Sequence, residues 1–100
     1  MPSKLFVLLK SPSEYAELDL LAALGGDDRI GALLFEDAVL YSVLKDKGEE
    51  LLSIVDHAYV MGDDLEARGF KGKASKGFEV IDYPRAIDLI MDDYDLCMTI

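Results

Sequence analysis

Cysteine is nearly absent from this chain of 100 residues, and tryptophan is absent altogether. A single thiol, Cys97, excludes an intrachain disulfide and is typical of a reducing compartment. No apolar run approaches the roughly 20 residues that a membrane span needs. The N-terminus also lacks the apolar core and cleavage site of a signal peptide. We therefore expect a cytoplasmic protein that does not associate with membranes.

Basic residues are also scarce: 10 Lys and Arg stand against 20 Asp and Glu, which gives a net charge of -10. This balance argues against a nucleic-acid surface or an anionic membrane as partner, because both need clustered cations. It favours solubility, or a partner with a basic face. Apolar residues make up 51% and alternate with charge, which predicts one globular domain over residues 1–100.

Short apolar runs alternate with segments of helical spacing. Because strands that alternate with helices form right-handed βαβ units, this order predicts an α/β fold with a five-stranded, largely parallel sheet flanked by helices, of the flavodoxin-like or Rossmann-like kind. The expected strands are 5–9, 29–35, 57–61, 78–81 and 96–100. The expected helices are 14–24, 38–44, 49–55, 63–68 and 83–91, with a polar turn at 45–48. Ser13 is the expected cap of the first helix, and Tyr15 is expected on its apolar face.

Carboxylates follow three of these runs: Glu36 and Asp37, Asp63 and Asp64, and Asp82. The carboxyl ends of parallel strands form the edge where ligands and partners bind, so these acids are candidates for a functional site. They are equally suited to be helix N-caps, which we take as the simpler interpretation, with Asp37 capping the helix over 38–44. Arg68 is placed to pair with the acids of its own segment, Asp63, Asp64 and Glu66.

Signatures of catalysis or of a cofactor are missing. The first strand ends in Lys10 and Ser11, where a magnesium-binding receiver domain carries an acidic pair. No glycine motif for phosphate binding is present, and His57 has no nucleophile-elbow serine or cysteine to serve. We expect no metal, no cofactor and no catalysis of its own.

Cys97 and Tyr41 each have two interpretations. Cys97 lies between Leu96 and Met98 in the last predicted strand, with aspartates nearby, so we expect a buried structural cysteine rather than a sulfur acceptor. Tyr41 is expected on a helix that covers the sheet, where it packs in the core or contributes to a subunit interface.

Four motifs, in order, resemble the DsrH/TusB family of the DsrE/DsrF/DsrH-like superfamily. They are Ser11-Pro12, the run 33–39 (LLFEDAV), the segment 64–69 (DLEARG), and Ile81-Asp82-Tyr83 followed by Asp88-Leu89. The resemblance implies a small subunit that assembles with DsrE- and DsrF-like proteins into hexamers. Such complexes pass sulfur as a persulfide, either toward 2-thiouridine in tRNA or within intracellular sulfur oxidation.

The chain departs from the family pattern at three positions. Many members carry a cysteine in the first helix where Leu21 stands here, the family's Glu-Asp-Gly ends in Ala38, and Thr99 lies where a tryptophan is usual. Because a persulfide carrier needs a thiolate, the resemblance implies an accessory or structural subunit of a sulfur-relay complex.

The expected partners are copies of itself and/or DsrE- and DsrF-like subunits, in an oligomer that does not contact nucleic acid directly. The alternative is a stand-alone homo-oligomeric module that binds a ligand or a partner through its acidic strand ends. The interface candidates for either hypothesis are Glu36, Asp37, Tyr41, Asp64 and Arg68.

Overall fold

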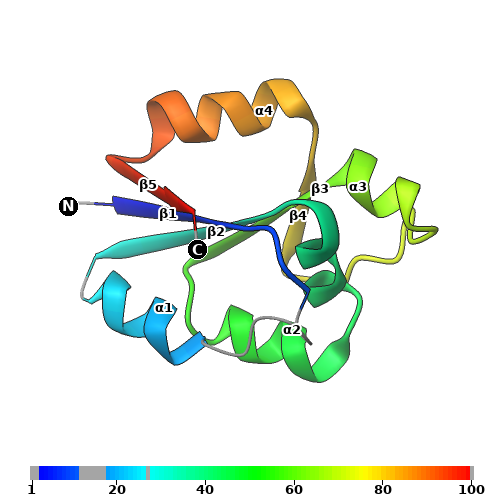
Figure 1. Ribbon diagram of the computed structural model, residues 1–100, viewed down its shortest axis with the longest axis horizontal. Helices are drawn as coiled ribbons and strands as arrows, with labels where there is room; N and C mark the ends of the chain where they lie inside the picture. The colour runs from blue at the N-terminus through cyan, green and yellow to red at the C-terminus, as the bar shows by residue number, and fades with distance from the viewer. Residues whose placement is uncertain (1–2, 12–17, 27, 100) are drawn as a thin grey trace.

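A single parallel sheet forms the centre of the computed structural model, which describes residues 3–11, 18–26 and 28–99. All strand pairs in this part of the chain are parallel, in the order β4-β3-β2-β1-β5 (Figure 1). The predicted parallel α/β fold is therefore confirmed. The strands are β1 (Ser3–Leu8), β2 (Arg29–Leu34), β3 (His57–Met61), β4 (Phe78–Ile81) and β5 (Leu96–Thr99).

Helices cover both faces of the sheet, which explains why the inner strands are apolar after their first one or two residues. One layer holds α1 (Leu18–Gly25), the 3₁₀-helix η1 (Glu36–Ser42) and α2 (Lys45–Leu52). The other holds α4 (Tyr83–Asp88), which continues as the π-helix η2 (Leu89–Asp93). Figure 1 shows α4 on one side of the sheet, with α1 and α2 on the other. The short helix α3 (Gly62–Ala67) follows β3 directly.

Each layer has its own apolar core. Phe6 of β1 points into the core beneath α1 and α2, whereas Leu5 and Val7 point into the core beneath α4. In that second core the hydroxyls of Tyr59 and Tyr94 lie 3.3 Å apart. Burial and this hydrogen bond raise the pKa of Tyr94 far above its ordinary value, so its hydroxyl stays neutral, and the contact links the sheet to the α4 layer.

The predicted polar turn at 45–48 is wrong, because these residues form the first half of α2. Gly48 explains the difference. Its amide donates to the Leu44 carbonyl at 2.8 Å, and a Cβ built on it would lie 2.6 Å from the Tyr41 carbonyl oxygen. The glycine therefore lets the helix pack closely against η1, a contact between elements that composition does not reveal.

The other helix bounds also shift. The helix expected over 38–44 is a 3₁₀-helix that begins at Glu36, and the one expected to reach Val55 ends at Leu52. The helix predicted over 83–91 is present and extends to Asp93 through its π-helical end. The predicted cap Ser13 and Tyr15 lie outside the described residues.

Candidate functional site

Acidic side chains gather at the carboxyl edge of the sheet because the three strands that supply them run in the same direction. The residues after β2, β3 and β4 consequently lie at one end of the molecule. We call this group the acidic rim. It consists of Glu36, Asp37, Asp63, Asp64, Glu66 and Asp82.

Asp64 ties the segment after β2 to the one after β3. One of its carboxylate oxygens accepts a hydrogen bond from the Glu36 amide at 2.7 Å. Glu36 itself has a φ of 51°, a left-handed conformation that a non-glycine residue adopts at a cost. The short hydrogen bond that the Glu36 amide donates to Asp64 helps to hold Glu36 in this conformation, which turns the chain abruptly from β2 into η1.

Arg68 forms a second link between the segment after β2 and the segment after β3. Its Nε donates to Asp37 at 3.0 Å, and its Nη1 donates to the Asp64 carbonyl at 3.3 Å. Arg68 therefore pairs with an acid of the rim, but the carboxylate is that of Asp37 rather than one of the acids expected from its own segment. The ion pair between Arg68 and Asp37 is partly exposed. Because exposed ion pairs contribute only about 0.2–1 kcal/mol to the free energy of unfolding, its main effect is to fix the relative position of the two segments.

The N-cap interpretation holds for only one of the three strand ends. Asp82 caps α4 by accepting from the Arg85 amide at 3.0 Å. Phe35 occupies the N-cap position of η1 and Met61 that of α3, with no side-chain cap at either. The expectation that Asp37 caps its helix is therefore wrong, because its carboxylate binds Arg68 instead.

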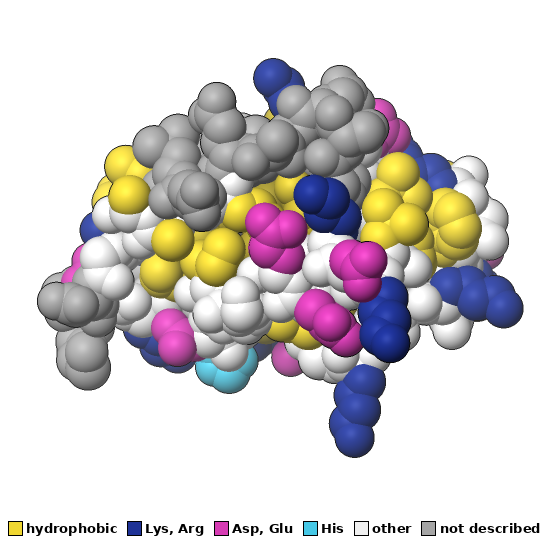
Figure 2. Space-filling view, turned by 90° about the horizontal axis from the view of Figure 1, so that it is seen from below, with side chains coloured by type: hydrophobic (Ala, Val, Ile, Leu, Met, Phe, Trp, Pro, Cys, Tyr) yellow, Lys and Arg dark blue, Asp and Glu magenta, His cyan; other side chains and the backbone are white. Residues whose placement is uncertain are grey.

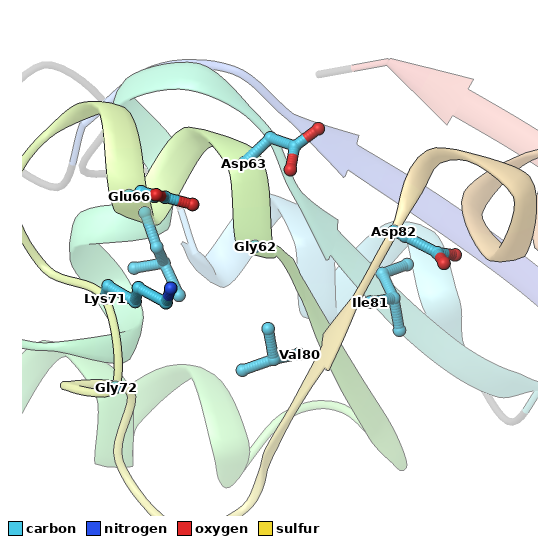
Figure 3. A pocket seen from close by; sticks show the side chains of 9 residues that line it. Gly62, Asp63, Glu66, Lys71, Gly72, Val80, Ile81 and Asp82 are labelled. Carbon is cyan, nitrogen blue, oxygen red and sulfur yellow. The ribbon is translucent and has the colours of Figure 1, made fainter.

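A hollow of about 370 Å³ opens beside the rim, between α3, β4 and the loop after α3. Glu66 and Lys71 lie on the α3 side and Val80 on the β4 side (Figure 3). Lys71 was not predicted to belong to this hollow. It reaches the hollow because the loop after α3 folds back over the edge of the sheet, which the spacing of residues in the sequence does not reveal. Mixed carboxylates, one ammonium and an apolar floor suit the docking of a partner rather than nucleophilic chemistry.

The rim offers no evident cation site: across residues 3–11, 18–26 and 28–99, no three His, Cys, Asp or Glu side chains converge as metal ligands. Its carboxylates instead engage the backbone and Arg68 or face solvent. A surface of this kind can recognise a cationic group through charge and hydrogen bonds.

Cys97 is exposed, so the expectation of a buried cysteine is wrong. It lies on β5, an edge strand that pairs only with β1 in the described part of the sheet, opposite Leu5. Partial burial of the sulfur raises the pKa of the Cys97 thiol above its ordinary value. The thiol is therefore accessible but stays protonated at neutral pH, which makes it a poor nucleophile.

Two other residues singled out in the sequence lie in the core. Tyr41 belongs to η1, is 1% exposed and packs into the core beneath this helical layer, so of its two interpretations the structure supports core packing. Leu21, which the resemblance implies stands in place of a cysteine, is also fully buried. The structure thus brings together Glu36, Asp37, Asp64 and Arg68 and leaves Tyr41 and Cys97 apart from them.

The sheet order and the helical layers define a small α/β protein of the class that carries sites at the carboxyl edge of a parallel sheet. The family model described as DsrH like protein matches residues 10–95, and the chain belongs to this family. The ychN protein from E. coli has a similar fold, with a TM-score of 0.80 over 100% of both chains at 16% sequence identity.

A search of curated proteins found no match to this sequence. Within the described residues, no helix has the length and apolar character that crossing a membrane requires. Family membership supports a subunit related to sulfur relay in coarse terms, and the finer role depends on the residues of this chain.

Proposed function

We propose that this protein is an accessory subunit of a cytoplasmic sulfur-relay complex, in which DsrE- and DsrF-like partners carry the persulfide and this chain supplies a docking surface. The complex would serve tRNA 2-thiouridine synthesis or intracellular sulfur oxidation. Family membership supports the relay, and the residues of the chain support the accessory role.

The observation that carries the proposal is the state of the one thiol. A persulfide carrier attacks the donor sulfur as a thiolate, so it needs a lowered pKa or a neighbouring cation. The pKa of Cys97 is raised instead, and no described Lys, Arg or His contributes to its shift. At the position of the family cysteine, Leu21 offers neither a thiol nor access to solvent.

The acidic rim is the proposed docking surface. Glu36, Asp37, Asp63 and Glu66 are exposed, while Asp64 and Arg68 are partly buried and hold the loops together. A preorganised surface loses little entropy on binding. Its charge favours a partner with a basic face and steers the encounter.

Persulfide loading tests the accessory role. The purified protein is incubated with a cysteine desulfurase, cysteine and a DsrE-like protein from the same cell, and each chain is analysed by intact mass spectrometry without reductant. We expect added sulfur on the DsrE-like protein and none on Cys97. Stable sulfur on Cys97, lost in Cys97→Ser, would instead identify this chain as a carrier.

A matched pair of charge reversals tests the rim. Glu66→Lys places a cation at the rim, and Glu49→Lys makes the same change on exposed α2, away from the rim. We expect Glu66→Lys to weaken binding of the DsrE- and DsrF-like partners about tenfold, or about 1.4 kcal/mol. The control should bind like the unmodified protein. Equal affinities for both variants would show that the rim is not the docking surface.

A further inference from the structure

Strand β4 lies at one edge of the sheet, next to the acidic rim. It pairs with β3 on its inner side, and no other strand of the described residues pairs with its outer side. We call this outer side of Phe78–Ile81 the β4 edge. An edge strand carries outward-pointing backbone N–H and C=O groups, with which a further strand can pair.

Val80 shows that the β4 edge lacks a neighbour. It stands opposite Val60 of β3, which is fully buried, yet 54% of the surface of Val80 is open to solvent. Because side chains alternate along a strand, Val80 shares a face of the sheet with Phe78, and it lines the hollow between α3 and the loop after α3 (Figure 3). A strand added at this edge would cover Val80 with apolar contacts.

Glu79 gives the opposite face of the β4 edge a negative charge. It is exposed, and it stands opposite Tyr59 of β3. More exposed carboxylates border the hollow beside the edge, namely Asp63, Glu66 and Asp82. The exposed part of β4 therefore combines one apolar and one acidic side chain, which point to different faces of the sheet.

Cations near the β4 edge are fewer than these carboxylates. Lys71 lines the hollow, and Lys76 precedes the strand by two residues. Arg85, whose guanidinium feels the charge of Glu79, is bonded to Asp93 at 2.8 Å. On the face over α1 and α2, by contrast, Lys or Arg side chains lie beside several of the carboxylates (Figure 2). The charge at the β4 edge thus favours a cationic segment.

We propose that the β4 edge binds an extended segment of a partner protein as an additional strand, in which apolar residues alternate with Lys or Arg. An apolar residue lies beside Val80 and a basic residue beside Glu79, because cross-strand neighbours share a face of the sheet. Backbone hydrogen bonds supply affinity, and the alternating side chains supply specificity. The inference rests on the proposed function for the identity of the partner, and on the β4 edge for the mode of binding.

A synthetic peptide tests this mode of binding directly. The probe is a fluorescent, acetylated peptide with the sequence Lys-Val-Lys-Val-Lys-Val, and its binding to the full chain is measured by fluorescence anisotropy. The control peptide, Lys-Lys-Lys-Val-Val-Val, has the same charge and composition without the alternation. We expect saturable binding of the alternating peptide and about fivefold weaker binding of the control.

A pair of variants locates the contact on the protein. Val80→Lys places a cation on the β4 edge, and the fold should tolerate it because Val80 is exposed. Leu24→Lys adds the same charge at an exposed position of α1. We expect Val80→Lys to weaken binding of the alternating peptide about fivefold and Leu24→Lys to leave it unchanged. Circular dichroism checks that both variants are folded.

Hydrogen–deuterium exchange of the unmodified protein provides a measurement that needs no variant. At saturating peptide, the amides of β4 should exchange about tenfold more slowly, and those of β5, at the other edge of the sheet, should not change. Absence of binding, equal binding of the two peptides, equal effects of the two variants, or protection of β5 instead of β4 would each overturn the inference.

The outcomes also separate this inference from the proposed function. A protein that binds the DsrE- and DsrF-like partners but not the alternating peptide would overturn the inference and leave the proposed function standing. A protein that binds the peptide through β4 but neither partner would support this mode of binding and contradict the proposed function.

Discussion

Glu36 occupies a backbone conformation that its side chain disfavours, at the point where β2 turns into η1. Its φ of 51° is typical of glycine, and strain of this kind costs on the order of 1–3 kcal/mol. The sequence showed that acidic residues follow the second strand, but it could not show the backbone strain at Glu36. This strain depends on how η1 is anchored in the folded protein. The hydrogen bond from the Glu36 amide to the Asp64 carboxylate is the anchor.

Glu36→Gly should therefore stabilise the protein. Glycine relieves the strain but loses more entropy on folding, which leaves a gain of up to about 1 kcal/mol in the free energy of unfolding. Urea denaturation followed by circular dichroism measures it. As a control, Glu66→Gly within α3 should destabilise by about 0.5–1 kcal/mol. A destabilising effect of Glu36→Gly would show that this conformation carries no strain.

Cys97 combines an accessible thiol with a raised pKa, and alkylation separates these two properties. The folded protein should react with iodoacetamide completely, because the residue is exposed. The reaction rate should rise at a higher pH than it does for a short peptide of the same local sequence, because the thiolate is disfavoured in the fold.

The measurement is the pH profile of the alkylation rate, from neutral pH upward. A profile shifted below that of the peptide would mean that the fold favours the thiolate. The accessory role would then lose its chemical basis, since such a cysteine is suited to carry sulfur.

At the scale of elements, the strands were predictable and some helices were not. Strands such as 57–61 and 78–81 were predicted with correct bounds because short apolar runs ending in polar residues are local signals. The segment 45–48 failed because Lys, Asp and Gly resemble a turn, while its helical state depends on packing against Tyr41.

The hydrogen bonds of the acidic rim were also not predictable from local sequence. An aspartate after a strand is typical of an N-cap, and Asp82 is one. Asp37 and Asp64 form bonds to residues 31 and 28 positions away, so only the folded arrangement distinguishes them from caps. The strand order was enough to place Glu36, Asp37 and Asp64 at one edge of the sheet, but the bonding that organises these residues was not predictable.

Gly48→Ala tests the packing account of α2. Alanine is favoured over glycine by about 1 kcal/mol in a helix, yet here its Cβ would lie 2.6 Å from the Tyr41 carbonyl oxygen. We expect a net loss of about 1–3 kcal/mol in thermal or urea unfolding. Lys47→Ala, on the exposed side of the same helix, should change stability by less than about 0.5 kcal/mol. Stabilisation by Gly48→Ala would contradict the close approach of α2 to η1.

At the scale of the whole molecule, the charged side chains are unevenly distributed. The acidic rim lies at the carboxyl edge of the sheet, and five of the ten basic residues lie at the start of α2 or in the loop after α3. A net charge of -10 suggested solubility or a basic partner, but it could not show where on the fold the few lysines lie.

The central claim is that this chain joins a sulfur-relay complex without carrying sulfur. Native mass spectrometry of the complex purified from its own cells, after loading with a cysteine desulfurase and cysteine, tests it most directly. We predict that the chain is found with DsrE- and DsrF-like subunits, that the added sulfur resides on those partners, and that this chain keeps its unmodified mass. Persulfide on Cys97, or a chain that associates with neither partner, would contradict the account.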